Sequence, residues 1–417
     1  MNSILQLKGR FEQRSNRSRP GSPKLPKGKS VSASHLRELE KQLERILVYW
    51  TENKDIRGAL VSVHYKHIVA KSNRLKILLS ENGKSPTESI RGAKFVWEPD
   101  QKGNEVQKHV FTHFVSLQAI EKSIDVLKKT ASIIEQYYKG SVPSEVIEEL
   151  GEKYHFNEVP KTSFLKTVVD GFYVERFDID RATEEITEEA IITIYQTGVD
   201  TKRLLSKFGI DIVDDRIIDG TTLRLNPDEV KLLYNNASYL IAMGVTDFSE
   251  ISRDDVLDAY EDMEEDAGLL IPHPQNEPVI GVIDTQFNEK VYFHEWVEYK
   301  NLLDPNIPLS RKDYEHGTAV SYIIVDGPQG NPELADGCGR FRVRHFGVAT
   351  NNGFSSFTVL KMIRNIVASN RDIKVWNLSL GSKLEIKPNF ISPEAAELDR
   401  IQSEYDVIFV VAGTNIP

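Results

Sequence analysis

Apolar residues recur at helical spacing near the start of the patterned part of the chain. In residues 33–50, leucine and isoleucine occupy positions 36, 39, 43, 46 and 47. A helix over this segment would carry one apolar side. The sequence therefore predicts an amphipathic helix that packs this side into a core.

Strand-like and helical runs alternate after this helix. Strands are expected near Leu60, Phe95 and Phe111, a short helical stretch near Leu75 and a long helix over 117–138. This order predicts a ferredoxin-like α+β unit, which a later strand such as SFLKTVV (163–169) would close. We assign residues 33–180 to this N-terminal α+β domain.

A second alternating pattern occupies residues 181–246. It reads as strand, helix, strand, helix, strand, in the segments AIITIY, VDTKRLLSKFG, DGTTLRL, NPDEVKLLYNN and SYLIAM. Asn226 is expected to cap the second helix, with Pro227 in its first turn. The segment predicts a second, smaller α+β unit.

The last patterned region, residues 278–417, alternates buried-type strands with helices. Strands are expected in GVID, RFRVRHFGVA, KVWNLSL and VIFVVAG, and helices in FSSFTVLKMIRNIVASN and SPEAAELDRIQSEY. In the second of these strands the arginines would face one way, and Phe341, Val343 and His345 the other. Such alternation predicts right-handed crossovers and a parallel sheet with helices on both faces.

Two segments break the pattern. Residues 1–32 are basic and rich in proline, glycine and serine around positions 10–30, which predicts a disordered arm. Residues 247–277 contain an acidic stretch, 250–266, with nine acidic residues against one arginine. This linker is either a solvated face or an exposed tether that proteases would cut easily.

Composition narrows the function classes. The chain has 417 residues and a net charge of −10, which argues against a general nucleic-acid binder. Cys338 is the only cysteine, so no internal disulfide forms. The N-terminus lacks a secretory apolar region, and no apolar run is long enough to span a membrane. We expect a cytoplasmic protein that binds neither nucleic acid nor membrane.

A carboxylate at the end of an apolar strand raises a chemical question. Asp284 ends the run in GVIDTQFN, where a charge must be satisfied or functional. His294 and Glu295 are followed by Glu298, where a zinc-protease helix needs its second histidine. The sequence therefore predicts no metal site and no cofactor.

Four motifs in order resemble those of the subtilase family of serine proteases. PVIGVIDTQFNEK resembles the aspartate motif, and EHGTAVSYIIV, thirty-two residues on, resembles the histidine motif. KVWNLSLGS resembles the strand that lines the substrate cleft, and VIFVVAGTN the strand that ends at the oxyanion asparagine. The resemblance implies the N-terminal portion of a subtilisin-like catalytic domain over residues 278–417.

The resemblance also implies roles for individual residues. His316 would be the general base, Asp284 would orient it, and Asn415 would donate to the oxyanion. Ser379, Leu380 and Gly381 would pair with an extended substrate. Gly317 would let the backbone turn at the start of the histidine helix.

The sequence departs from the family pattern in three places. Gln286 replaces the glycine of the aspartate motif, and Ala412–Asn415 is one residue longer than the usual Ala-Gly-Asn. No Gly-Thr-Ser, the nucleophile motif, occurs in the chain. We therefore expect a truncated or processed piece of a longer protease, whose serine lies beyond residue 417.

Residues 221–243, TTLRLNPDEVKLLYNNASYLIAM, resemble the second half of the propeptides that inhibit such proteases. The leading hypothesis is thus a cytoplasmic serine endopeptidase, autoprocessed or regulated by its N-terminal region. Its partners would be a protein or peptide substrate, the internal inhibitory unit and an ATPase, as in some bacterial subtilases. The alternative is a degenerate subtilase that acts as a protein-binding or inhibitory module.

Overall fold

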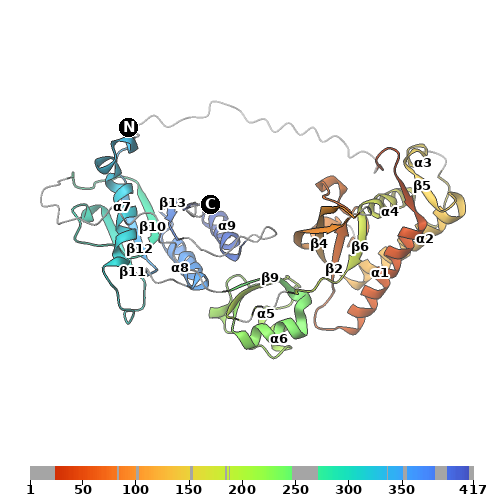
Figure 1. Cartoon of the computed structure of the whole chain (residues 1–417), viewed down its shortest axis with the longest axis horizontal. Helices are drawn as coiled ribbons and strands as arrows, with labels where there is room; N and C mark the ends of the chain where they lie inside the picture. The colour runs from red at the N-terminus through yellow and green to blue at the C-terminus, as the bar shows by residue number, and fades with distance from the viewer. Residues whose placement is uncertain are drawn as a thin grey trace. The chain divides into compact units, whose positions relative to one another are not determined.

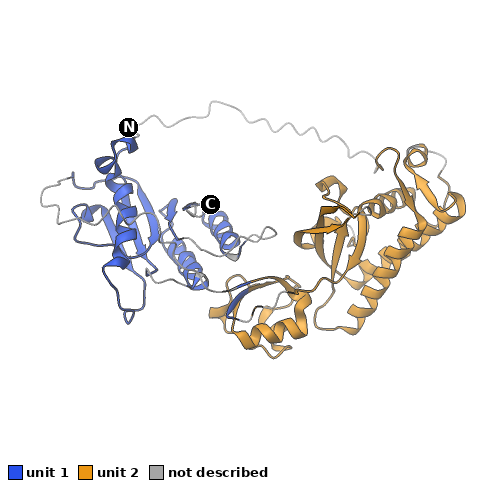
Figure 2. Ribbon diagram, in the orientation of Figure 1, with its two compact units in different colours: residues 1–8, 188–191, 245–417 blue, residues 9–187, 192–244 orange. Residues whose placement is uncertain are grey.

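The computed structural model describes residues 24–81, 84–99, 103–150, 154–183, 186, 188–246, 271–335, 337–350, 355–380 and 392–412. These residues form two compact units (Figure 2). Unit 1 contains residues 188–191 and the described residues after 244, and unit 2 contains the other described residues up to 244. None of the described helices is both long and apolar enough to cross a membrane.

Unit 2 contains a four-stranded antiparallel sheet in the order β3-β4-β2-β6. Its strands are β2 (Ala59–Tyr65), β3 (Ile90–Pro99), β4 (Glu105–Val115) and β6 (Val174–Asp178). Because β4 is antiparallel to both neighbours, β2 and β3 run parallel to each other with β4 between them. This is the split arrangement expected of a ferredoxin-like unit.

Three long helices cover this sheet: α1 (Ala33–Glu52), α2 (Leu117–Tyr137) and α4 (Lys161–Tyr173). Helices α1 and α2 pack side by side (Figure 1), and α1 also contacts β2 and β6. The predicted apolar side of α1 is buried at Leu36, Leu39 and Leu43. Ser32 caps the helix by accepting a hydrogen bond from the backbone N–H of His35.

The predicted closing strand SFLKTVV is wrong, because this segment belongs to helix α4. Phe164 and Val168, and likewise Leu165 and Val169, stand four residues apart, which is helical spacing, and all four side chains are buried. The two valines suggested a strand, but the closing strand is β6, which follows directly.

The end of the predicted disordered arm is ordered. Residues 30–32 form β1 (Ser30–Ser32), which pairs with β5 (Ser141–Pro143) ahead of the short helix α3 (Ser144–Glu149). Leu25 is buried as well. The arm therefore joins the fold earlier than its composition suggests, because Leu25 and Val31 supply apolar anchors within a polar segment.

The second predicted α+β unit forms a three-stranded sheet in the order β8-β7-β9. Its elements are β7 (Ala190–Ile194), α5 (Thr201–Ser206), β8 (Thr222–Leu225), α6 (Pro227–Ala237) and β9 (Ile241–Thr246). The predicted cap is confirmed: Asn226 accepts from the N–H of Glu229, and Glu229 accepts from the N–H of Asn226, each at 2.9 Å. Pro227 stands first in α6, as expected.

Unit 1 contains a five-stranded, fully parallel sheet in the order β11-β12-β10-β13-β14. The strands are β10 (Val279–Asp284), β11 (Val297–Asn301), β12 (Arg342–Gly347), β13 (Val375–Leu378) and β14 (Ile408–Val411). The connecting helices are α7 (Lys312–Gly330), α8 (Ser356–Ser369) and α9 (Pro393–Tyr405).

The strand order gives the path of the chain through the sheet. The chain passes from β10 to β11 at one edge, returns through α7 to β12, and continues through α8 to β13 and through α9 to β14. Helix α7 contacts β10 and β12, while α8 and α9 contact each other. The predicted fold class, a parallel α/β sheet preceded by α+β units, is confirmed.

Candidate functional site

The carboxyl end of β10 is the centre of the candidate site. Strand β10 is the middle strand of the sheet, and the chain leaves it toward β12 on one side and later returns to β13 on the other. Open α/β sheets place their ligand sites at such a reversal, outside the carboxyl ends of the strands. Asp284 is the last residue of β10, and its side chain is fully buried.

His316 stands in the second turn of α7 and reaches this carboxylate. Its Nδ1 lies 2.6 Å from Oδ1 of Asp284, and its side chain keeps 29% of its surface exposed. The hydrogen bond to Asp284 raises the pKa of His316 above its ordinary value, although burial acts in the opposite direction. Since Asp284 binds Nδ1, the ring nitrogen left to accept a proton is Nε2.

Thr285 connects the strand end to the helix that carries the histidine. Oδ1 of Asp284 accepts hydrogen bonds from the backbone N–H and the hydroxyl of Thr285, at 2.6 and 3.2 Å. The same hydroxyl oxygen accepts from the N–H of Gly317 at 3.0 Å. Oδ2 of Asp284 is buried and accepts no hydrogen bond from the described residues. One carboxylate oxygen is thus fixed by three neutral or weakly basic donors.

Gly317 is required for close packing rather than for a turn. A Cβ atom at this position would lie 2.6 Å from the carbonyl oxygen of Gln286 and 2.8 Å from that of Thr285. Both obstacles are backbone atoms, which cannot move aside. Gly317 lies inside α7 and is not among the positive-φ glycines, so the predicted turn is not its reason.

His345 is a second histidine beneath the site, and the sequence did not indicate this role. It is fully buried, as its predicted facing in β12 requires, and burial lowers its pKa. Its Nε2 donates to the carbonyl oxygen of Thr285 at 2.8 Å, and its Nδ1 lies 2.9 Å from the Ser321 hydroxyl. A neutral imidazole satisfies both contacts, so His345 supports the strand end without carrying charge.

Gln286, the residue in place of the family glycine, is also fully buried and bonded. Its backbone N–H donates to the carbonyl of Asp313 at 2.9 Å, and its side-chain amide donates to that of Ala349 at 3.0 Å. Its side-chain oxygen accepts from the Tyr299 hydroxyl at 2.6 Å. The backbone of Gln286 thus ties the end of β10 to α7, and its side chain ties it to β11 and to the loop after β12.

The remaining predicted residues follow β13 and β14 in the sequence. Ser379 and Leu380 directly follow β13 and are half-buried, and the Ser379 hydroxyl accepts from the Asn377 amide at 2.7 Å. Gly381 and Asn415 lie outside the described residues. Within the described ranges, no group of three or more histidine, cysteine, aspartate or glutamate residues could hold a metal ion.

Comparison with models of protein families gives a match. The model of the subtilase family, peptidase S8, matches residues 275–417. No curated protein matches the chain. The matched segment contains the whole parallel sheet and both members of the Asp284–His316 pair.

Proposed function

Because residues 275–417 form a subtilisin-like domain, we propose that this protein is a serine endopeptidase with Asp284 and His316 in its Asp-His-Ser triad. The observation that carries this proposal is the 2.6 Å contact between His316 Nδ1 and a buried carboxylate at the carboxyl end of a parallel strand. The order aspartate before histidine along the chain is that of subtilisin. The serine of this proposal would follow residue 417.

The geometry supports a definite division of work within the triad. Nε2 of His316 would take the proton of the serine hydroxyl during attack and later give it to the leaving amine. Asp284 would keep the proton on Nδ1 and stabilise the imidazolium that forms. The raised pKa of His316 supports this role, because it means that the carboxylate already favours the charged ring before a substrate binds.

The proposed substrate site follows from the same sheet. An extended peptide would lie along Ser379, Leu380 and Gly381, just beyond the end of β13, and pair with their backbone as an added strand. Asn415 would donate its side-chain amide to the developing oxyanion. Loss of such a donor costs about 3 kcal/mol of transition-state stabilisation.

We further propose that residues 181–246 act as an internal inhibitory unit, as subtilase propeptides do. The support is the strand-helix-strand order of β8, α6 and β9, with the capped helix Pro227–Ala237, ahead of the acidic segment 247–277. Cleavage in that segment would release the protease. The site of action would be the cytoplasm, on a protein or peptide substrate, with an ATPase as a further partner.

An activity-based probe tests the proposal. A fluorophosphonate forms a covalent bond only with an activated serine, so protein expressed from the complete reading frame should be labelled. His316→Ala and Asp284→Asn should lose labelling, because the serine would no longer be deprotonated. His294→Ala, which changes an exposed histidine of the same unit, is the matched control and should be labelled normally.

Absence of labelling in the wild-type protein, or equal labelling in all variants, would contradict the proposal. The alternative of a degenerate subtilase that binds proteins without cleaving them would then be preferred. Peptide binding that survives His316→Ala, measured by fluorescence anisotropy, would support that alternative.

A further inference from the structure

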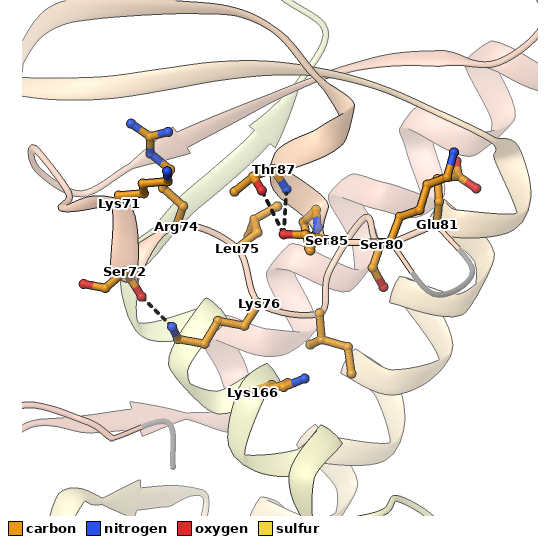
Figure 3. Close-up of a pocket in the computed structure, with 13 residues that line it drawn as sticks. Lys71, Ser72, Arg74, Leu75, Lys76, Ser80, Glu81, Ser85, Thr87 and Lys166 are labelled. Atoms are coloured by element: carbon orange, nitrogen blue, oxygen red, sulfur yellow. Dashed lines mark hydrogen bonds between the residues drawn. The ribbon is translucent and has the colours of Figure 1, made fainter. Parts of the chain in front are cut away.

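A pocket of about 660 Å³ lies in unit 2, on the connection between β2 and β3 (Figure 3). Its lining includes five basic side chains, Lys71, Arg74, Lys76, Lys84 and Lys166, and one acidic side chain, Glu81. Lys166 comes from α4, and the other four come from the connection itself. Neither the site in unit 1 nor the proposed peptidase function uses this pocket.

The basic side chains that line the pocket outnumber the acidic side chains that line it. Glu81 is already engaged, since its two oxygens accept from the backbone N–H and the hydroxyl of Ser116 at 2.6 and 3.1 Å. Lys76 donates to the carbonyl of Ser72, an uncharged group. Within the described part of the chain, none of the five basic groups forms an ion pair with a carboxylate.

Arg74 lines the pocket, and an aromatic ring holds its guanidinium in place. The guanidinium lies over the ring of Phe111, 4.6 Å from the centroid. A guanidinium that is already fixed loses less conformational freedom when it binds a ligand.

The wall of the pocket is fixed in place although it contains only 3₁₀ turns. The buried carboxylate of Asp170 accepts hydrogen bonds from three successive backbone N–H groups, those of residues 76–78, at 2.8, 2.9 and 3.0 Å. The next residue, Leu79, is fully buried, has a positive φ of 58° and donates to the Ser123 hydroxyl. Such strain in a non-glycine residue is characteristic of functional segments. A rigid wall reduces the entropic cost of binding a ligand.

We infer that this pocket binds a small molecule that carries two or more phosphate groups. A single carboxylate would leave most of the five positive charges unbalanced, whereas a di- or triphosphate supplies several charges and many acceptor oxygens. Arginine presents a fork of donors that suits phosphate oxygens, and lysines bind phosphate as point charges. The hydroxyls of Ser72 and Ser80 add neutral donors to the lining.

The shape and the overall charge favour a small molecule over a nucleic acid. The hollow has the volume of a small-ligand site, which ranges from about 300 to 1,000 Å³. The whole chain has a net charge of −10, so a long polyanion would be repelled beyond the pocket.

Isothermal titration calorimetry on the full chain tests this inference. The probes are inorganic phosphate, pyrophosphate, tripolyphosphate and ATP, at constant ionic strength and without divalent cations. We expect affinity to rise from phosphate to tripolyphosphate. Arg74→Gln and Lys84→Gln should each weaken tripolyphosphate binding by about tenfold or more, because each removes a charge-assisted contact.

Lys128→Gln is the matched control, because it removes an equal charge from an exposed position of α2. Lys84 is exposed, so its variant should fold even if loss of the Arg74 stack disturbs the unit. No binding of tripolyphosphate at millimolar concentration, or an equal loss in Lys128→Gln, would overturn the inference. Much tighter binding of ATP than of tripolyphosphate would identify a nucleotide, and equal binding would identify the phosphate chain; both support it.

Discussion

The described part of the chain contains two histidine–aspartate pairs, one in each unit, and they differ in what surrounds them. In unit 1, His316 lies 2.6 Å from Asp284, whose other contacts are neutral. In unit 2, His64 lies 2.9 Å from Asp180, which also forms an ion pair with Lys94 at 2.6 Å. His316 keeps 29% of its side-chain surface exposed, whereas His64 keeps 5%.

This difference separates a reactive pair from a structural one. Burial disfavours the charge of Asp180, but the hydrogen bonds from His64 and Lys94 outweigh it and hold the pKa of this carboxyl well below its usual range. Asp180 is therefore neutralised by a permanent cation, and Nδ1 of His64 is buried and has no hydrogen-bond partner among the residues that the structure describes. In the Asp284 pair, the imidazole of His316 is the group that can balance the negative charge of the carboxylate. This imidazole is partly exposed, so a substrate can reach it.

The largest expected effect is on peptide hydrolysis, which should depend on the Asp284 pair and not on the Asp180 pair. Asp284→Asn should lower kcat/KM for peptide hydrolysis by about 10⁴-fold, because the asparagine amide would stabilise the wrong tautomer of the imidazole. Asp180→Asn should leave kcat/KM unchanged. Hydrolysis of a fluorogenic peptide by protein from the complete reading frame measures both. Equal losses in the two variants would mean that the pairs do not differ in this way.

The second effect concerns stability, for which the Asp180 pair is expected to matter more than the Asp284 pair. Asp180→Ala should destabilise unit 2 by about 2 kcal/mol, because it leaves the buried His64 and the partly exposed Lys94 without their acceptor. Amide hydrogen exchange in β2, followed by mass spectrometry, reports on this unit alone. Asp284→Asn should leave exchange in β2 unchanged. Unaltered protection in Asp180→Ala would show that this pair contributes little.

The third effect concerns the support of the reactive pair. Gln286→Ala should destabilise unit 1 by about 1–3 kcal/mol, since the half-buried Tyr299 hydroxyl and the Ala349 carbonyl would lose their partner. Hydrogen exchange in β10 should increase, and the rate of fluorophosphonate labelling should fall. Gln118→Ala, at an exposed position of α2, is the matched control. Unchanged exchange in β10 would rule out this supporting role.

The parts that the sequence could predict are those encoded by spacing along the chain. The alternation of strand and helix predicted the parallel sheet, and the motif order pointed to Asp284 and His316, whose catalytic role stays a prediction. The contacts of His345 and Gln286 could not be predicted, because they join Thr285, Tyr299 and Ala349 across the sheet. A polar residue in an apolar strand, as at His345, was the only signal available.

The difference between spacing within a segment and contacts between distant segments explains two further results. The prediction for α4 from the sequence was wrong, and the basic pocket was not predicted. The run SFLKTVV fits both periods over its short length, so the packing of α4 against α1 and α2 decides it. The pocket depends on Lys166 and Asp170 meeting a connection some 90 residues earlier in the chain, as the separation of 94 residues between Lys76 and Asp170 illustrates. Spacing within one segment carries no information about such a meeting.

The smallest expected effect is a shift in the pH dependence of activity, which depends on the Asp284–His316 pair. Because Asp284 raises the pKa of His316, the neutral base forms only at a pH above the ordinary histidine value of 6.5, and the acid limb of kcat/KM should lie there. Asp284→Asn should move this limb to lower pH. The same interaction stabilises the folded protein, and this stabilisation decreases with pH where activity increases. It is fully present below the pKa of His316 in the unfolded chain and is lost as pH rises through the pKa of His316 in the folded protein. Titration of the imidazole carbon-bound protons by NMR measures the shift directly, and an identical midpoint in the variant would show that Asp284 does not set it.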